Sequence, residues 1–214
     1  MPKKHILFDF DGVICESLHE KTKAFYNLYL PFGEDIAQKV VKHHTENMGV
    51  SRFEKIKYYH KTFLDSILTA EEVLFFADKF SSLVMQKVID APLVEGLTSF
   101  LDKYSSSFDF KVITATPTEE IVEIISKKKL SNYFSSLHGS PESKSYWIQL
   151  LLSTGAISAS NCYFIGDAMS DYNAAEQNGI PFILRRTDSN SNISILPNVL
   201  LSFHEYGELD HSIF

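Results

Sequence analysis

The sequence predicts an α/β fold, namely a Rossmann-like open parallel sheet core interrupted by an inserted all-helical cap domain. Short apolar runs end directly at turn or acidic residues, which is typical of buried parallel strands. Helical patterns separate these runs, as in repeated βαβ units. Residues 17–91, by contrast, contain no convincing strand. We therefore expect a core formed by residues 1–16 and 92–214 and a helical cap formed by residues 17–91.

The composition limits the classes of function. The chain has 214 residues, of which 44% are hydrophobic and 22% charged, which is ordinary for a globular protein with an apolar core. The formal net charge of -7 argues against a nucleic-acid partner, because phosphate backbones require clustered Lys and Arg. A phosphorylated small molecule stays possible, since a cationic pocket or a bound metal can reverse the charge locally.

Cysteine usage and hydrophobicity indicate a reducing, non-membrane setting. Cys15 and Cys162 match no metal-ligand spacing and are too few for a disulfide framework. No apolar stretch of signal-peptide length precedes the first acidic residues, and no segment approaches a membrane span. We expect a cytoplasmic protein that contacts no membrane.

The core strands are predicted from short apolar runs. The first run, Lys4–Phe8, leads directly into Asp9-Phe10-Asp11-Gly12 and so fits a buried strand that ends at a turn. Two later runs have the same character, and two more are weaker. The later runs are Lys111–Ala115, Asn161–Ile165, Pro181–Leu184 and Val199–Phe203.

The inserted region is predicted to be helical throughout. Residues 18–30 and 35–48 have helical patterns, and a further helix begins at Thr69, which forms a T-x-x-E capping box with Glu72. Apolar residues then recur at steps of three and four until Pro92 closes the region. These apolar positions are Val73, Ala77, Phe80, Val84 and Val88.

Two acids stand at the carboxyl end of the first predicted strand. Asp9 and Asp11 belong to a D-x-D-G sequence that ends at Gly12. Ligands of open α/β sheets bind beyond the carboxyl ends of the strands. Two carboxylates this close repel each other unless a divalent cation neutralises them, and hard oxygen ligands suit Mg²⁺. The motif is weak by itself, because an acidic turn that merely ends a strand has the same sequence.

A second pair of acids, Asp167 and Asp171, follows the apolar run Asn161–Ile165. A residue here could simply cap the next helix, but a cap does not explain an acid at the point where the strand stops. If the two strands are parallel neighbours, Asp9, Asp11 and Asp167 converge. Uncompensated charges this close would cost about 4 kcal/mol each at an effective dielectric constant of ~20, so we expect a magnesium ion.

The run Ile113–Glu119 joins a predicted strand to a predicted helix. We expect Thr116 at the N-cap, Pro117 at the first helical position and Glu119 closing a second T-x-x-E box. The free amides of such a helix start can bind phosphate, and Thr114 can add a hydroxyl donor. A plain strand-to-helix connection explains the caps but leaves Thr114 without a role.

Lys144, taken by itself, is expected to be a solvated surface group. Its place in the order of motifs changes this expectation. Through Asp9–Val13, Thr114, Lys144 and Gly166–Asp171, the chain resembles the haloacid dehalogenase (HAD) superfamily of phosphohydrolases. The resemblance covers nearly the whole chain, because that superfamily places its first cap domain where residues 17–91 lie. The likeness is to the branch of phosphoglycolate phosphatases and β-phosphoglucomutases, whose caps are helical.

The resemblance implies a role for each matching position. Asp9 would attack phosphorus and form an aspartyl-phosphate. Asp11 would protonate the leaving oxygen and later activate water. Thr114, Ala115 and Lys144 would bind the oxygens of the transferring phosphoryl group.

The resemblance also implies the metal ligands. Asp9, Asp11 through its backbone carbonyl, and Asp167 would hold Mg²⁺. Asp171 would act on the metal through water or orient Lys144.

The predicted cap contains the candidates for substrate contact. Gly49-Val50-Ser51-Arg52 resembles a G-V-S-R stretch of β-phosphoglucomutases, whose arginine meets the distal phosphate of the substrate. A solvent-facing Arg52 at a helix start fits the sequence equally well. Lys55, His43 and His44 are weaker candidates, and we expect the two histidines on a solvated helix face.

The leading hypothesis is a magnesium-dependent phosphatase acting on a small phosphomonoester such as phosphoglycolate or a sugar phosphate. A phosphoglucomutase-like isomerase is the first alternative. Lys21, a further candidate for substrate contact, argues against it, because related caps often have histidine at that position. A non-catalytic metabolite-binding module on the same fold is the second alternative. The complete set of matching acids, threonine and lysine argues against that module, and the sequence leaves the oligomeric state open.

Overall fold

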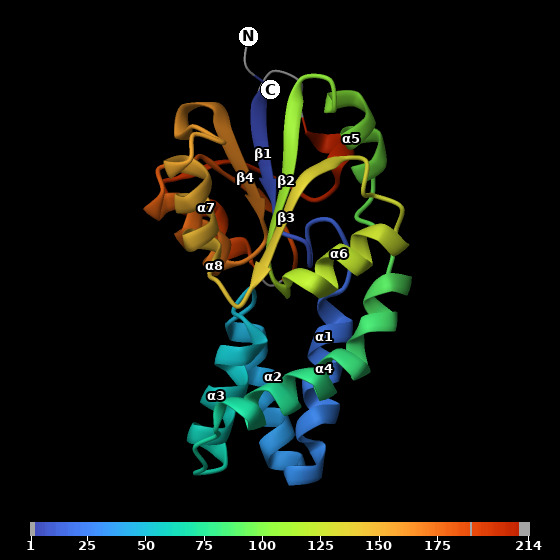
Figure 1. The fold of residues 1–214 in the computed structure, drawn as a ribbon, viewed down its shortest axis with the longest axis vertical. Coiled ribbons are helices and arrows are strands. Elements are labelled where there is room, and N and C mark those ends of the chain that lie inside the picture. Colours follow the sequence, from blue (N-terminus) through green and yellow to red (C-terminus); the bar gives the residue numbers. More distant parts are fainter. Residues whose placement is uncertain (1–2, 189, 210–214) are drawn as a thin grey trace.

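The computed structural model describes residues 3–188 and 190–209, and a parallel sheet forms its centre (Figure 1). The strand order is β3-β2-β1-β4-β5-β6, and every neighbouring pair is parallel. The strands are β1 (Lys4–Phe8), β2 (Phe108–Pro117), β3 (Phe134–Ser140), β4 (Cys162–Gly166), β5 (Phe182–Arg185) and β6 (Val199–Phe203). The predicted α/β fold with an open parallel sheet is confirmed.

Helices cover both faces of the sheet, which explains why β1 is apolar at consecutive positions. Ile6 and Phe8 pack with α5 (Leu97–Tyr104) and α6 (Thr118–Lys127), whereas Leu7 packs on the opposite face. The helices of that opposite face are α7 (Lys144–Ser153) and α8 (Met169–Gln177). Figure 1 shows the two pairs of helices on either side of the sheet.

The edge strand β3 was missed by the sequence analysis. Its sequence, FSSLHGS, contains no apolar run, and it pairs with β2 alone. Only Phe134, Gly139 and Ser140 in it are buried. A strand at the edge of a sheet can stay polar because part of it faces water, so it lacks the pattern that revealed the central strands.

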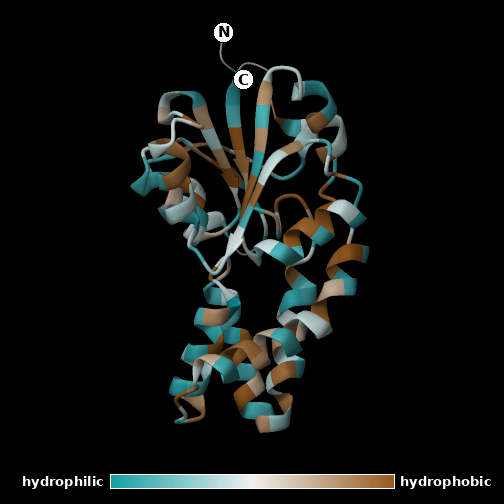
Figure 2. Cartoon of the chain, in the orientation of Figure 1, coloured by the Kyte–Doolittle hydropathy of each residue, from teal (hydrophilic) through white to brown (hydrophobic). Residues whose placement is uncertain are grey.

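Four helices between β1 and α5 form what we call the helical insert. They are α1 (Leu18–Tyr29), α2 (Glu34–Glu46), α3 (Arg52–Phe63) and α4 (Ala70–Asp90). The insert lies beyond the carboxyl ends of the strands (Figure 1). Its helices alternate hydrophobic and hydrophilic residues along their length (Figure 2). The aromatic rings of Phe25, Tyr59 and Phe80 meet between the helices, with centroids 4.3 Å apart for Phe25 and Phe80.

No helix within residues 3–188 and 190–209 is both long enough and apolar enough to cross a bilayer.

The two predicted capping boxes had different outcomes. The first is confirmed, because Thr69 Oγ1 accepts from the Glu72 amide at 3.3 Å and Glu72 Oε2 accepts from the Thr69 amide at 2.8 Å. The second is wrong, since β2 continues through Pro117 and α6 begins at Thr118 without a side-chain cap. Thr116 stays in the strand because its hydroxyl is bound at the site described below.

Replacing Thr69 by Ala is expected to lower the free energy of unfolding by about 1 kcal/mol, because the first amides of α4 lose their side-chain acceptor. Urea unfolding followed by circular dichroism measures this change. Thr62→Ala is the matched control, since Thr62 is exposed inside α3 and alanine favours helix there. Equal stability of Thr69→Ala and wild type would contradict a stabilising role for the box.

Candidate active site

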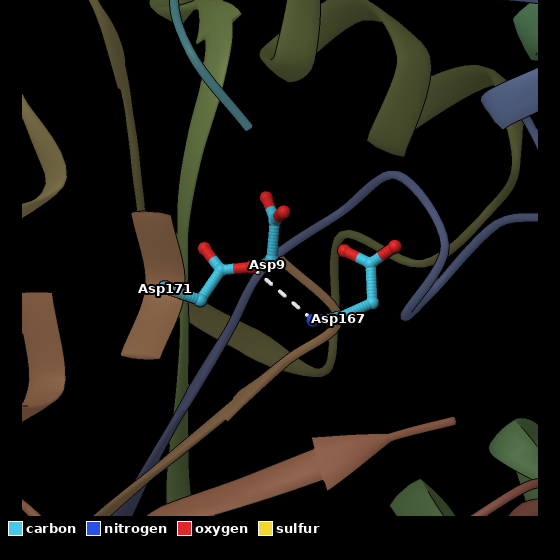
Figure 3. Close-up of side chains that lie close together, drawn as sticks. All are labelled: Asp9, Asp167 and Asp171. Atoms are coloured by element: carbon cyan, nitrogen blue, oxygen red, sulfur yellow. Dashed lines mark hydrogen bonds between the residues drawn. The ribbon is translucent and has the colours of Figure 1, made fainter. Parts of the chain in front are cut away.

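Three buried carboxylates converge where β1 and β4 end. β1 and β4 are parallel neighbours with Phe8 opposite Ile165, so the residues after each strand emerge side by side. The amide of Asp9 extends this pairing and donates to the Ile165 carbonyl at 2.9 Å. Carboxylate oxygens of Asp9, Asp167 and Asp171 all lie within 4.8 Å of one another. Figure 3 shows these three side chains gathered at one point.

Gly12 allows the loop after β1 to approach these acids. Its φ of +76° is a left-handed conformation that glycine adopts without strain. A Cβ at this position would lie 2.4 Å from Oδ2 of Asp167. The glycine of the D-x-D-G sequence is therefore required by backbone conformation and by the space that the Asp167 carboxylate occupies.

Lys144 is buried among the acids, so the solvated surface position considered for it is wrong. Lys144 is the first residue of α7. Ser143 caps this helix, because its side chain accepts a hydrogen bond from the Tyr146 amide. Nζ of Lys144 lies 2.8 Å from Asp9 Oδ2 and 2.5 Å from Asp171 Oδ1. Burial lowers the pKa of this ammonium, but the two carboxylates outweigh burial and raise the pKa above its usual value. Lys144 is thus a fixed cation beside Asp9.

Asp171 orients Lys144 with one oxygen and caps α8 with the other. Its Oδ2 accepts from the amides of Ala168 at 3.0 Å and Asp167 at 3.2 Å, and the latter bond is dashed in Figure 3. The helix-capping alternative considered for this position therefore holds for Asp171. Capping does not replace its link to Lys144, because the two contacts use different oxygens.

The pKa values of Asp9 and Asp167 are both raised, because the two carboxyl groups are buried close to other acids. Burial raises the pKa of Asp9 to about 7, with Lys144 opposing the rise and Asp171 and Asp11 adding to it. Burial, together with Asp171 and Asp9, raises the pKa of Asp167 well above its usual value. One lysine does not compensate these acids. The hard oxygen donors of Asp9 and Asp167 fit a divalent cation such as Mg²⁺, which would keep both ionised.

The side chain of Asp11 turns away from this cluster and has its own partners. Ser17 Oγ donates to its Oδ1 at 2.6 Å, and Thr116 Oγ1 donates to its Oδ2 at 3.2 Å. Lys21 of the insert forms a salt bridge with the same Oδ2 and donates to Thr116 Oγ1 at 2.7 Å. Although burial raises the pKa of Asp11, Lys21 and the two hydroxyls lower it below its usual value. Asp11 is thereby held as a carboxylate.

The end of β2 supplies the remaining predicted residues on the core side. Thr114 is buried, and its Oγ1 accepts from the Thr116 amide at 3.2 Å. Thr114 and Ala115 border a narrow cavity of about 40 Å³, which also reaches Asp9, Asp11 and Asp167. The cavity therefore joins the acids to the residues expected to bind phosphate.

The insert closes the opposite side of this cavity and brings cations to it. Lys21, His44, Arg52 and Lys55 all line it, together with Gly49. A Cβ at Gly49 would lie 2.0 Å from the Ser170 hydroxyl, so glycine permits close contact between the insert and α8. Of the predicted substrate contacts, Lys21, Gly49 and Arg52 border the cavity, as do the weaker candidates His44 and Lys55, whereas His43 is not among its lining residues.

Arg52 is buried at 5% exposure, so the solvent-facing position considered for it is wrong. Its guanidinium binds both carboxylate oxygens of Glu120 on α6, at 2.8 and 2.7 Å. It also donates to Ser81 Oγ at 2.6 Å and lies 4.7 Å from the centre of the Phe80 ring. The donors of Arg52 that would suit a phosphate are therefore bound to Glu120, and they tie the insert to the core.

The expectation that both cap histidines face water is wrong for His44, which is 4% exposed, while His43 is half-buried. Lys55 is 2% exposed, and its Nζ lies 2.8 Å from His44 Nδ1. The burial of Lys55 could have been suspected from the sequence. Lys55 lies at helical spacing from the aromatic and aliphatic residues that form the buried face of α3, and two residues of this face are cations. These buried residues are Arg52, Lys55, Ile56, Tyr59 and His60.

Sequence and structure comparisons agree with this arrangement. Residues 6–185 match the family model described as haloacid dehalogenase-like hydrolase. No curated protein matches the chain.

Several solved structures share the fold at low sequence identity. A β-phosphoglucomutase from Clostridium difficile has a TM-score of 0.79 at 17% identity, covering 99% of this chain and 95% of that one. A predicted phosphatase from Clostridium acetobutylicum has a TM-score of 0.74 at 19% identity, covering 95% of each chain. A predicted phosphoglycolate phosphatase from Haemophilus somnus has a TM-score of 0.71 at 18% identity, covering 95% and 94%. Identities this low establish the shared fold alone.

Mg²⁺ is expected to raise the melting temperature of the wild type and to lose most of this effect in Gly12→Ala. The added Cβ displaces the Asp167 carboxylate, and stabilisation by a ligand follows its affinity for the folded state. Differential scanning fluorimetry over a Mg²⁺ series measures the shift.

Gly155→Ala is the matched control for this measurement. Gly155 has a φ of +72°, but a Cβ there meets no atom within 4 Å. The control introduces the same backbone strain but no steric clash. Its melting temperature should therefore lie below that of the wild type, while the increase caused by Mg²⁺ is retained. A wild-type shift in Gly12→Ala would contradict a cation site beside Asp167.

Proposed function

The chain belongs to the haloacid dehalogenase-like hydrolases, and we propose that it is a magnesium-dependent phosphatase that hydrolyses a small phosphomonoester through an aspartyl-phosphate on Asp9. One observation carries this proposal. Asp9 stands beside the buried cation Lys144 and the buried acid Asp167, at the end of a cavity that the insert closes.

The first step would be attack by the Asp9 carboxylate on phosphorus. A covalent phosphoaspartate divides one difficult displacement into two easier ones. Lys144 is already ionised and rigidly held, so it can bind a phosphoryl oxygen without reorganising. The hydroxyl of Thr114 and the backbone at Ala115 border the same space and would bind further phosphoryl oxygens.

Asp9, Asp167 and the backbone carbonyl of Asp11 would hold Mg²⁺, with Asp171 keeping Lys144 in place. When bound, Mg²⁺ would supply positive charge to the acids and to the phosphoryl oxygens. This assignment is supported by the raised pKa of Asp9 and of Asp167, because burial of both as carboxylates requires more positive charge than Lys144 provides.

Asp11 would handle the protons of both steps. Its contacts with Ser17, Thr116 and Lys21 fix its position and favour the carboxylate. The carboxylate is the form that accepts a proton from water when the phosphoaspartate is hydrolysed. In the first step Asp11 would donate a proton to the leaving oxygen, so it would first have to take up a proton from solvent, which requires the Lys21 contact to loosen.

Residues 17–91 would act as a cap that shields the reaction from water and selects the substrate. The bidentate Arg52–Glu120 pair supports this role, because it links the insert to α6 of the core. The substrate would be a small phosphorylated metabolite rather than a nucleic acid. Both cysteines are free and buried, which supports a reducing, cytoplasmic location.

Phosphate release from a panel of phosphomonoesters is the experiment that tests the proposal. We expect Mg²⁺-dependent turnover by the wild type, and a loss of at least about 1,000-fold in kcat for Asp9→Asn, since the nucleophile is removed. Asp35→Asn, an exposed acid on α2, should behave as the wild type. Turnover that survives in Asp9→Asn, or that persists in EDTA, would contradict the proposal.

The same panel separates the two alternatives. A phosphoglucomutase-like isomerase would convert β-glucose 1-phosphate only with a sugar bisphosphate activator and release little phosphate. A non-catalytic binding module would retain a phosphorylated ligand without turnover under any condition.

A further inference from the structure

Among the described residues that line the cavity, one lysine has no acidic partner. Lys21 is paired with Asp11 and Arg52 with Glu120. Lys55, on the same side of the cavity, forms no salt bridge with any described residue, and its hydrogen bond goes to His44. An ammonium has three donors, so two of those on Lys55 have no protein acceptor among the described residues.

A lysine buried in this way is costly unless something compensates its charge. Lys55 is 2% exposed and lies 5.7 Å from the centre of the Phe25 ring. Burial and the nearby Lys21 lower the pKa of Lys55 to about 7, with Lys144 adding to the effect and Asp11 opposing it. The protonated form of Lys55 thus has no acid among the described residues to balance its charge, and it borders the cavity.

His44 positions Lys55 through their hydrogen bond. It is 4% exposed, and burial together with Lys55 lowers its pKa well below the usual value, so the ring is neutral. A neutral ring can accept from Lys55 at Nδ1 while its proton is on Nε2. The two remaining donors of Lys55 are therefore the ones that an anion in the cavity would satisfy.

We propose that Lys55, positioned by His44, forms a second anion site in the cavity, which binds a carboxylate or phosphate at the non-reacting end of the substrate. The inference rests on the proposed function and narrows its substrates to phosphomonoesters with a second anionic group. It moves the predicted distal contact away from Arg52, because Glu120 and Ser81 already occupy that guanidinium.

Paired probes that differ in one anionic group test the site. Phosphoglycolate is compared with 2-hydroxyethyl phosphate, and 3-phosphoglycerate with glycerol 3-phosphate. Binding is measured by calorimetry with Mg²⁺ in the Asp9→Asn background, where the probes are not consumed. Hydrogen bonds to charged groups contribute enough for us to expect the anionic member of a pair to bind about 10- to 100-fold more tightly.

Adding Lys55→Met should reduce this preference by about 10-fold or more, since the cation is lost while the length of the side chain is kept. Lys55→Arg should keep the preference in part. Lys57→Met is the matched control, because Lys57 is an exposed lysine on the same helix, and it should leave the preference intact. Circular dichroism and the affinity for the neutral probes show whether Lys55→Met is folded.

The outcomes distinguish this inference from the proposed function. An unchanged preference in folded Lys55→Met, no preference in the parent, or no binding of any probe overturns the anion site. Phosphate release by the wild type is measured separately and decides the proposed function. A preference that depends on Lys55 without any phosphate release would support the anion site and overturn the phosphatase.

Discussion

The concentration of buried negative charge at the ends of β1 and β4 is the constraint on which the rest of the site depends. Parallel pairing places Asp9 and Asp167 side by side, directly after the ends of the two strands. Lys144 contacts Asp9 and Asp171 beside them, and Asp171 uses one oxygen for Lys144 and the other for two backbone amides. Buried charges of this kind are costly unless they are balanced, and a divalent cation held by Asp9 and Asp167 would balance them.

A second set of contacts holds the insert over these acids. Lys21 forms a salt bridge with Asp11, and Arg52 forms one with Glu120, so two cations of the insert are paired with acids of the core. These contacts hold the insert beside the cavity, but the charges of Lys21 and Arg52 are then paired with protein acids and not with a ligand. Lys55 and His44 differ from them because, among the described residues, they hydrogen-bond to each other and neither meets an acid. The insert thus contains cations that fix its position on the core, and one lysine, Lys55, whose remaining donors are available to a ligand.

Whether a strand or helix could be predicted from the sequence depended on how it is buried in the fold. The central strand β1 is buried on both faces, so a continuous apolar run revealed it. The edge strand β3 is polar and half-exposed, and it was missed. In the insert, α4 was predicted from its capping box and apolar face. The charged helix α3 was not assigned, although the spacing of its buried residues is helical.

The sequence alone determined the class of fold and the acids of the site, because apolar runs reveal buried strands and motif residues directly follow those strands. It also predicted the order of acids, threonine and lysine that the family shares. Only the tertiary structure decided which cations are free. The sequence favoured Arg52 over Lys55 as a substrate contact, yet Arg52 meets Glu120 and Lys55 meets no acid among the described residues. The reason is physical: the pairing of a charge depends on which distant segments folding brings beside it, and local spacing carries no record of that.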